Sequence, residues 1–254
     1  SSAASDVYKR QVCGKRAIDY FADKFDDPMM YAQAVKSVSV PTQSILFNID
    51  IEGPLTKDKT AVLRVFAKMF YNHCGFYGDD LKIAKLERFI EKQGKTQQFR
   101  EAFEKVNGAP WTETRDSFAF FEDDIVSVLQ STLGMSEQAA RNWFNGEETN
   151  ELSIAQLVAD IQEYVDGKGK DFRLLFMVDE VGQYIGDDGD LMINLQSLVE
   201  EIGIRCHGKV WVMVTSQEAI DSVVHITGND FSKIQGRFNT RLSLSSSSVD
   251  EVIK

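Results

Sequence analysis

The chain has 254 residues, 43% of them hydrophobic and 26% charged, which is enough for one large domain or two small ones. Its formal net charge of −11 argues against direct binding to the phosphate backbone of DNA, because the basic residues are not gathered in one stretch. No apolar run reaches the roughly 20 residues that cross a membrane, and the three cysteines are too scattered for a disulfide framework. We therefore expect a soluble, cytoplasmic protein.

The two ends of the sequence carry little structural pattern. Residues 1–11 show no hydrophobic period and resemble a cloning or assembly scar, so they are excluded from the fold prediction. The last residues, SSSSVDEVIK, have the Ser and Asp of a helix start and stop within its first turns. Both ends are expected to be cut.

Four short runs have the β-branched and aromatic composition of strands: 44–49, 173–178, 209–214 and 240–245. The first three are almost continuously apolar, which is typical of parallel strands covered on both faces, and Trp211 in the third is expected in the core. The fourth run alternates, as a more exposed strand would. Helical periods occupy residues 58–72, 81–90, 99–106, 119–129, 136–144, 154–165 and 190–204.

This order of elements predicts an α/β protein with a parallel sheet. About 120 residues separate the first two predicted strands, far more than one crossover requires, so a large helical insertion is expected between them. The predicted division is a core that starts in residues 12–50, a mostly helical insertion at 51–168, and the rest of the core at 169–254.

The sharpest chemical signal is LLFMVDEVGQ, in which a buried strand ends in Asp179 and Glu180. In P-loop enzymes the first acid of such a pair leans toward Mg²⁺ through its water shell, and the following Glu orients or activates the water that attacks the γ-phosphate. The alternative is structural: the two acids leave the sheet and cap the next segment. An apolar run followed by Asp-Glu arises often enough by chance to keep both interpretations open.

A second polar cluster, Thr215-Ser216-Gln217, follows the strand at 209–214. In a parallel sheet the carboxyl ends of neighbouring strands open on one crevice, so this cluster should lie beside Asp179 and Glu180. A hydroxyl there could bind the attacking water or the γ-phosphate. A local turn or helix cap is the alternative, and the two are compatible.

A third motif, GRFNTR, places Arg237 and Arg241 just before the fourth predicted strand. An arginine in such a place can stabilise the charge on a transferring phosphoryl group, within the chain or across a subunit interface. Most exposed arginines are instead solvated or paired with surface acids. The phosphate-binding motif G-x-x-x-x-G-K-[ST] does not occur, because CGKR and DGKGKD lack its spacing.

Several segments resemble the large P-loop ATPase of BREX phage-defence systems, the BrxC/PglY family. They are FMVDEVGQYIG, the Leu-Gln of LMINLQSLVEEIG, VWVMVTSQEAID and, above all, DFSKIQGRFNTRLSLSSS. The similarity extends back through NGAPWTETRDSFAFFEDD and SILFNID, and so covers nearly everything after residue 11.

The resemblance implies a partial AAA+/ASCE-like ATPase that uses ATP and Mg²⁺. It assigns Asp179 to the nucleotide and its metal, Glu180 to catalysis, and Thr215 and Ser216 to catalysis at the sensor position. By analogy with related ATPases, Arg237 is assigned to catalysis and Arg241 to nucleotide binding. The family carries its phosphate loop upstream of the matching part and a long region downstream of it; this chain has neither, so alone it should be inactive. Expected partners are other BREX proteins, including a DNA methyltransferase and a phosphatase-like protein. DNA is reached only through that complex, and a homo-oligomer is left open.

Two other functions compete with this one. The chain could be a scaffold or pseudo-ATPase that binds partner proteins through its helical insertion, or a general AAA+/STAND-like ATPase outside BREX. In ATPases of this kind the strand that precedes the phosphate loop lies between the sensor strand and the last strand. Without it, the strand at 240–245 should be detached or rearranged, the strand at 209–214 should expose an apolar edge, and the chain should fold poorly or self-associate.

Overall fold

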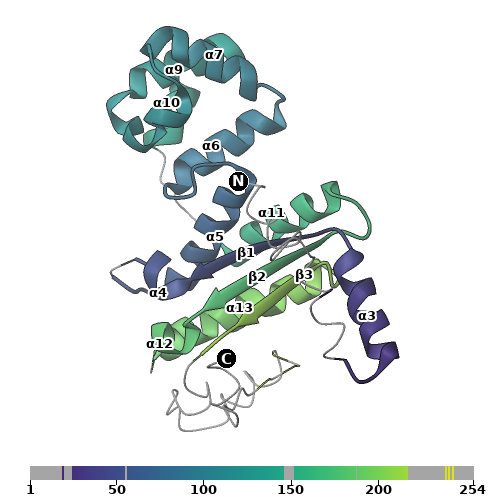
Figure 1. Ribbon diagram of the computed structural model, residues 1–254. Coiled ribbons are helices and arrows are strands. Elements are labelled where there is room, and N and C mark those ends of the chain that lie inside the picture. Colours follow the sequence, from purple (N-terminus) through teal and green to yellow (C-terminus); the bar gives the residue numbers. More distant parts are fainter. Residues whose placement is uncertain are drawn as a thin grey trace, which may run out of the picture.

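A computed structural model describes residues 19, 25–54, 56–145, 152–186, 188–216, 238, 240 and 242. Its elements in chain order (Figure 1) are α3 (Pro28–Ser39), β1 (Thr42–Asn48), α4 (Ile49–Glu52), α5 (Ala61–Cys74), α6 (Leu81–Lys92), α7 (Thr96–Asn107), α8 (Trp111–Thr114), η2 (Arg115–Phe120), α9 (Glu122–Leu133), α10 (Glu137–Asn145), α11 (Ile154–Gly167), β2 (Arg173–Asp179), α12 (Val181–Ile185), α13 (Gly189–Arg205) and β3 (Val210–Val214). The protein is α/β, as predicted. Within these ranges no helix is both long and apolar enough to cross a membrane.

The sheet has three parallel strands in the order β1-β2-β3. Its register places Ile45 opposite Phe176, and Phe176 opposite Val212. The first three predicted strands are therefore confirmed, with small shifts at their ends. Of the fourth, 240–245, only Thr240 and Leu242 are described; neither lies in a strand, and the rest of that prediction falls outside the described residues.

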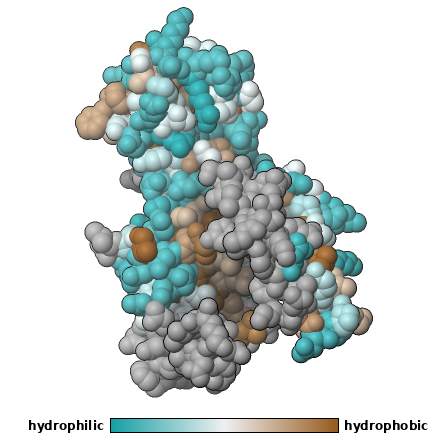
Figure 2. All heavy atoms as spheres, in the orientation of Figure 1, coloured by the Kyte–Doolittle hydropathy of each residue, from teal (hydrophilic) through white to brown (hydrophobic). Residues whose placement is uncertain are grey.

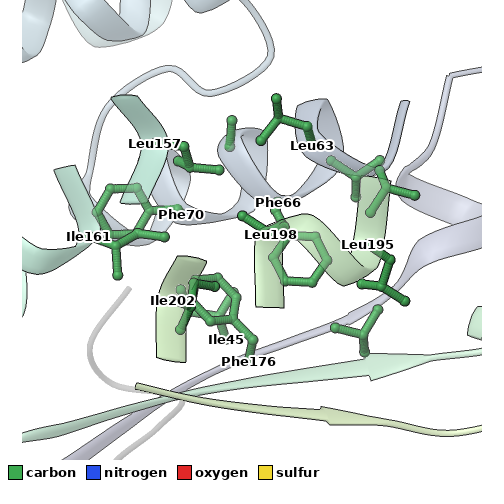
Figure 3. Packing of buried hydrophobic residues seen from close by; sticks show 14 of the residues in the cluster. Ile45, Leu63, Phe66, Phe70, Leu157, Ile161, Phe176, Leu195, Leu198 and Ile202 are labelled. Atoms are coloured by element: carbon green, nitrogen blue, oxygen red, sulfur yellow. The ribbon is translucent and has the colours of Figure 1, made fainter. Parts of the chain in front are cut away.

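One face of the sheet carries the main hydrophobic core. Along each strand alternate side chains point to this face, among them Ile45 and Phe176, which are at most 4% exposed. Helices α5, α11 and α13 cover it, and Figure 3 shows their Phe, Leu and Ile side chains meeting the strand residues. Phe66 of α5 touches both Phe47 and Phe176, with ring centroids 5.5 and 5.3 Å apart. Burying each such side chain contributes about 1.5–3 kcal/mol to the stability of the fold.

The opposite face of the sheet is apolar and is exposed on β1 and β3, which corrects the prediction that the strands are covered on both faces. Leu46, Trp211 and Met213 are 61%, 55% and 49% exposed. The placement of Trp211 in the core is likewise wrong. In Figure 2, an apolar strip is visible in the middle of the molecule. The continuous apolar runs of these strands therefore correspond to one buried face of the sheet and one apolar face with exposed residues.

We expect the chain to self-associate through this open face, because β3 is the terminal strand of the sheet among the described residues and its exposed side chains are large and apolar. Trp211→Lys combined with Met213→Lys should shift the protein toward monomer in size-exclusion chromatography with light scattering. Phe120→Lys is the matched control, since Phe120 is 86% exposed but lies on η2, away from the sheet. A monomeric starting protein would contradict the prediction, as would an equal effect of Phe120→Lys.

The helices between β1 and β2 divide into two groups by their packing. Helices α5 and α11 belong to the core under the sheet, whereas α6 to α10 enclose a second cluster of buried residues, seen as a separate group at the top of Figure 1. Phe99, Phe103 and Trp111 form its centre, with Trp111 edge-on to both phenyl rings. The second group is therefore narrower than the predicted insertion at 51–168, and that domain division stays a prediction.

A buried carboxylate ties this second group together. Glu87 on α6 is only 7% exposed and accepts hydrogen bonds from the backbone N–H of Tyr77 at 2.5 Å and from Nε1 of Trp111 at 2.7 Å. The Arg115 guanidinium donates a third bond at 3.0 Å, and Arg115 also donates to the carbonyl of Gly75 at 3.3 Å. One side chain thus links the loop after α5 to α6, α8 and η2.

Candidate functional site

The acids and hydroxyls singled out by the sequence lie at the carboxyl ends of the strands. Asp179 is the last residue of β2, and the register places it opposite Asn48, the last residue of β1. Val214 of β3 stands opposite Val178, so Thr215 follows beside Asp179. Figure 1 shows α4 and α12 at this same end of the sheet. The parallel arrangement therefore brings polar ends of all three strands to one edge.

Thr215 lies against both acids, as the parallel sheet predicts. Its hydroxyl donates to the carboxylate oxygen Oδ1 of Asp179 and accepts from the backbone N–H of Glu180 at 3.4 Å. The Thr215 backbone is fixed on both sides, because its N–H donates to the Val178 carbonyl at 2.9 Å and its carbonyl accepts from Val181 at 3.1 Å. The hydroxyl therefore holds the Asp179 carboxylate in one orientation.

Glu180 has an unusual backbone conformation. Its φ and ψ of 62° and 29° lie in the left-handed region, which costs a residue with a side chain about 1–2 kcal/mol. It occupies the cap position before α12, yet its side chain makes no capping hydrogen bond. Glu180 therefore stands where a capping residue would, but its carboxylate does not cap the helix. Strained backbone of this kind gathers at functional sites and persists only where neighbours hold it.

The remaining predicted residues are less well placed. The Ser216 hydroxyl is buried and makes no hydrogen bond to any described residue, so the structure does not join it to the acids. Gln217, Arg237 and Arg241 lie outside the described residues. Of the predicted set, the structure brings together Asp179, Glu180 and Thr215.

One element of this edge had no sequence signal. Lys57, in the loop between α4 and α5, donates to the backbone carbonyl of Tyr184 at 2.9 Å, and its ammonium lies 4.1 Å from the centre of the Tyr184 ring. Tyr184 is 2% exposed; burial, and then the charge of Asp50, raises the pKa of its hydroxyl. Because Lys57 and Tyr184 are far apart in the chain, no local pattern links them.

The edge could contribute a single carboxylate to a metal ion. Among the described residues no three His, Cys, Asp or Glu side chains are grouped to hold one. Asp179 is exposed and is oriented by Thr215. That donor set fits Mg²⁺, which proteins commonly bind through one or two carboxylates together with water and substrate phosphates. It does not fit zinc or a tightly caged calcium ion.

A cleft of about 470 Å³ lies elsewhere, beside Gln43 near the start of β1. Four of its charged side chains pair with one another: Arg88 pairs with Asp160 and Glu163, and Lys92 also pairs with Glu163 at 2.7 Å. The hydrogen bond from Lys92 helps to lower the pKa of Glu163. Burial lowers the pKa of His73 in the same wall, so it favours the neutral imidazole. We interpret this cleft as a gap where α6 and α11 pack near each other, and not as the site of catalysis.

No family model matches the sequence of this chain, and no solved structure matches its fold.

Proposed function

We propose that this chain carries the hydrolytic part of a P-loop ATPase site, in a protein of a bacterial BREX phage-defence system. The observation that carries the proposal is the arrangement at the carboxyl ends of β2 and β3. There, Thr215 binds the carboxylate of Asp179 and the backbone of Glu180. Support also comes from the strand order, in which the strand bearing the acids is flanked by the strand bearing the hydroxyl.

In this proposal each residue has a separate task. Asp179, oriented by Thr215, would hold Mg²⁺ through its water shell, and Mg²⁺ would supply charge neutralisation to the phosphates of ATP. The Glu180 carboxylate would accept a hydrogen bond from the attacking water and orient it. Thr215, which contacts the Asp179 carboxylate and the Glu180 backbone, would sense the γ-phosphate. Ser216, Arg237 and Arg241 keep the roles that the resemblance implies.

A phosphate-binding loop must come from sequence outside these 254 residues. The two described cations near Tyr184 already have partners: Lys57 binds Tyr184, and Arg64 is paired with Asp58. Without backbone amides and a Lys to hold the β- and γ-phosphates, two acids repel a nucleotide. In the longer protein, hydrolysis would drive a defence complex on DNA, with the methyltransferase and the phosphatase-like protein as partners and a homo-oligomer as one assembly.

We expect the 254-residue chain alone to show no ATP hydrolysis above a buffer blank, and a longer protein that includes the upstream phosphate loop to hydrolyse ATP. Phosphate release, measured with matched protein concentrations and with contaminating ATPases excluded, checks both. The same longer protein with the loop lysine replaced by Ala is the control. Turnover by the 254-residue chain at ordinary enzyme rates would refute the division of the site, and an inactive longer protein would refute the ATPase.

One observation favours a second function, that of a scaffold. Helices α6 to α10 have their own hydrophobic cluster, and Phe120 and Val106 are 86% and 50% exposed on this group. A self-contained helical unit with exposed apolar side chains is suited to binding a protein partner. If the longer protein does not hydrolyse ATP but still binds BREX proteins, this function replaces the first.

A further inference from the structure

The loop between α4 and α5 contacts α12, the short helix that follows Glu180. Lys57 binds the last turn of α12 through two contacts. Its ammonium group donates a 2.9 Å hydrogen bond to the Tyr184 carbonyl, and it makes a cation–π contact with the face of the Tyr184 ring. Asp50 lies 3.9 Å from the same ammonium group. A cation that binds the end of a helix and stacks on an aromatic ring gains from both contacts.

Gly53 closes the other side of this contact. A Cβ atom at Gly53 would lie 2.6 Å from the Tyr184 ring and 2.8 Å from the carbonyl of Ile49, closer than real side chains approach. The ring therefore packs directly on the backbone of the loop that carries Lys57. The loop and α12 form one contact from two directions.

Glu180 is connected to this contact through one turn of helix. The Tyr184 N–H donates to the Glu180 carbonyl at 3.0 Å, so the residue that Lys57 holds is itself bonded to Glu180. At the other end of α12, Val181 donates to Thr215. The left-handed backbone of Glu180 thus lies between two anchors, Thr215 directly after β3 and Lys57 in the loop between α4 and α5.

We propose that Lys57 is a positioning residue for Glu180. It acts through Tyr184 and α12, and it keeps the Glu180 carboxylate at the place where the attacking water must be oriented. This inference rests on the proposed ATPase function. Misplacement of a reacting group by a fraction of an ångström is costly in catalysis, so a contact one helical turn away can change the rate without touching substrate.

The first test uses the 254-residue chain and no nucleotide. Lys57→Met keeps the aliphatic stem and removes the charge, and Lys59→Met, at an exposed position on the same loop, is the matched control. Amide hydrogen exchange should accelerate about tenfold in residues 181–186 of Lys57→Met and stay unchanged in α6 to α10, because the opening is local. Unchanged exchange at 181–186, or the same acceleration in Lys59→Met, would overturn the inference.

The second test uses the longer protein. Lys57→Met should lower kcat about tenfold with KM for ATP unchanged, Lys57→Arg should recover most of that loss, and Lys57→Met should have little further effect when Glu180 is already Gln. Additive effects of Lys57→Met and Glu180→Gln would overturn the positioning role while leaving the ATPase intact. Normal hydrolysis by the Glu180→Gln protein would overturn the assignment of Glu180 and, with it, this inference.

Discussion

Glu180→Gln in the longer protein should lower kcat for ATP hydrolysis by about 10²–10³-fold and leave ATP and Mg²⁺ binding in place. The substitution preserves the shape of the side chain and removes the negative acceptor that orients water. Because Thr215 holds Glu180 through its backbone N–H, which the substitution leaves in place, the local structure should survive. Phosphate release gives kcat, and titration with a fluorescent ATP analogue gives the binding constant.

Glu113→Gln is the matched control for this variant, since Glu113 is an exposed acid in the second helical group. It should hydrolyse ATP as the unmodified protein does. Protection of cells against phage should fall with Glu180→Gln and not with Glu113→Gln. Full hydrolysis by the Glu180→Gln protein would move the catalytic role to another residue and strengthen the scaffold function.

Glu87→Ala should lower the free energy of unfolding of the second helical group by about 3–5 kcal/mol, the usual range for removing one partner of a buried charge pair. The carboxylate is 7% exposed and accepts three hydrogen bonds. Its removal takes the acceptor from the Trp111 N–H and the Tyr77 amide, takes one of two acceptors from the Arg115 guanidinium, and leaves a cavity. Urea unfolding followed by circular dichroism and tryptophan fluorescence measures the change.

Glu101→Ala provides the comparison, because Glu101 is exposed on α7 and accepts a hydrogen bond from the exposed Gln97. Its effect should stay within about 0.5 kcal/mol. Glu87→Gln should fall between the two, since an amide still accepts hydrogen bonds but no longer neutralises Arg115. Equal stability of Glu87→Ala and Glu101→Ala would show that the buried network contributes little beyond its neighbours.

The sequence predicts those parts of the fold that depend on local pattern. The apolar runs locate β1, β2 and β3, because a strand typically appears in a sequence as a short segment rich in β-branched residues and bounded by polar residues. The position of Thr215 beside Asp179 also follows, since parallel strands share one carboxyl edge. Both inferences need only neighbouring residues and a general rule of sheet topology.

Other features depend on residues far apart in the chain, and no local pattern contains them. Lys57 meets Tyr184, and Glu87 meets Arg115, only after the chain has folded. The exposure of Trp211 could not be predicted from the sequence for another reason. An apolar run shows that the side chains of a strand are hydrophobic, but it does not show which face of the strand a helix covers. The left-handed backbone of Glu180 could not be predicted either, because that conformation is usually predicted from a Gly in the sequence.

The register of the sheet separates what the fold requires from what the chemistry requires. A slip of one residue in β1 would turn Ile45 out of the core, so core packing disfavours it, and the observed alignment sets Asn48 beside Asp179. The side chain of Asp179 points to solvent at the strand end, where it contributes little to that choice. Substitutions at this edge should therefore change the proposed ATP hydrolysis with little cost to the stability of the fold.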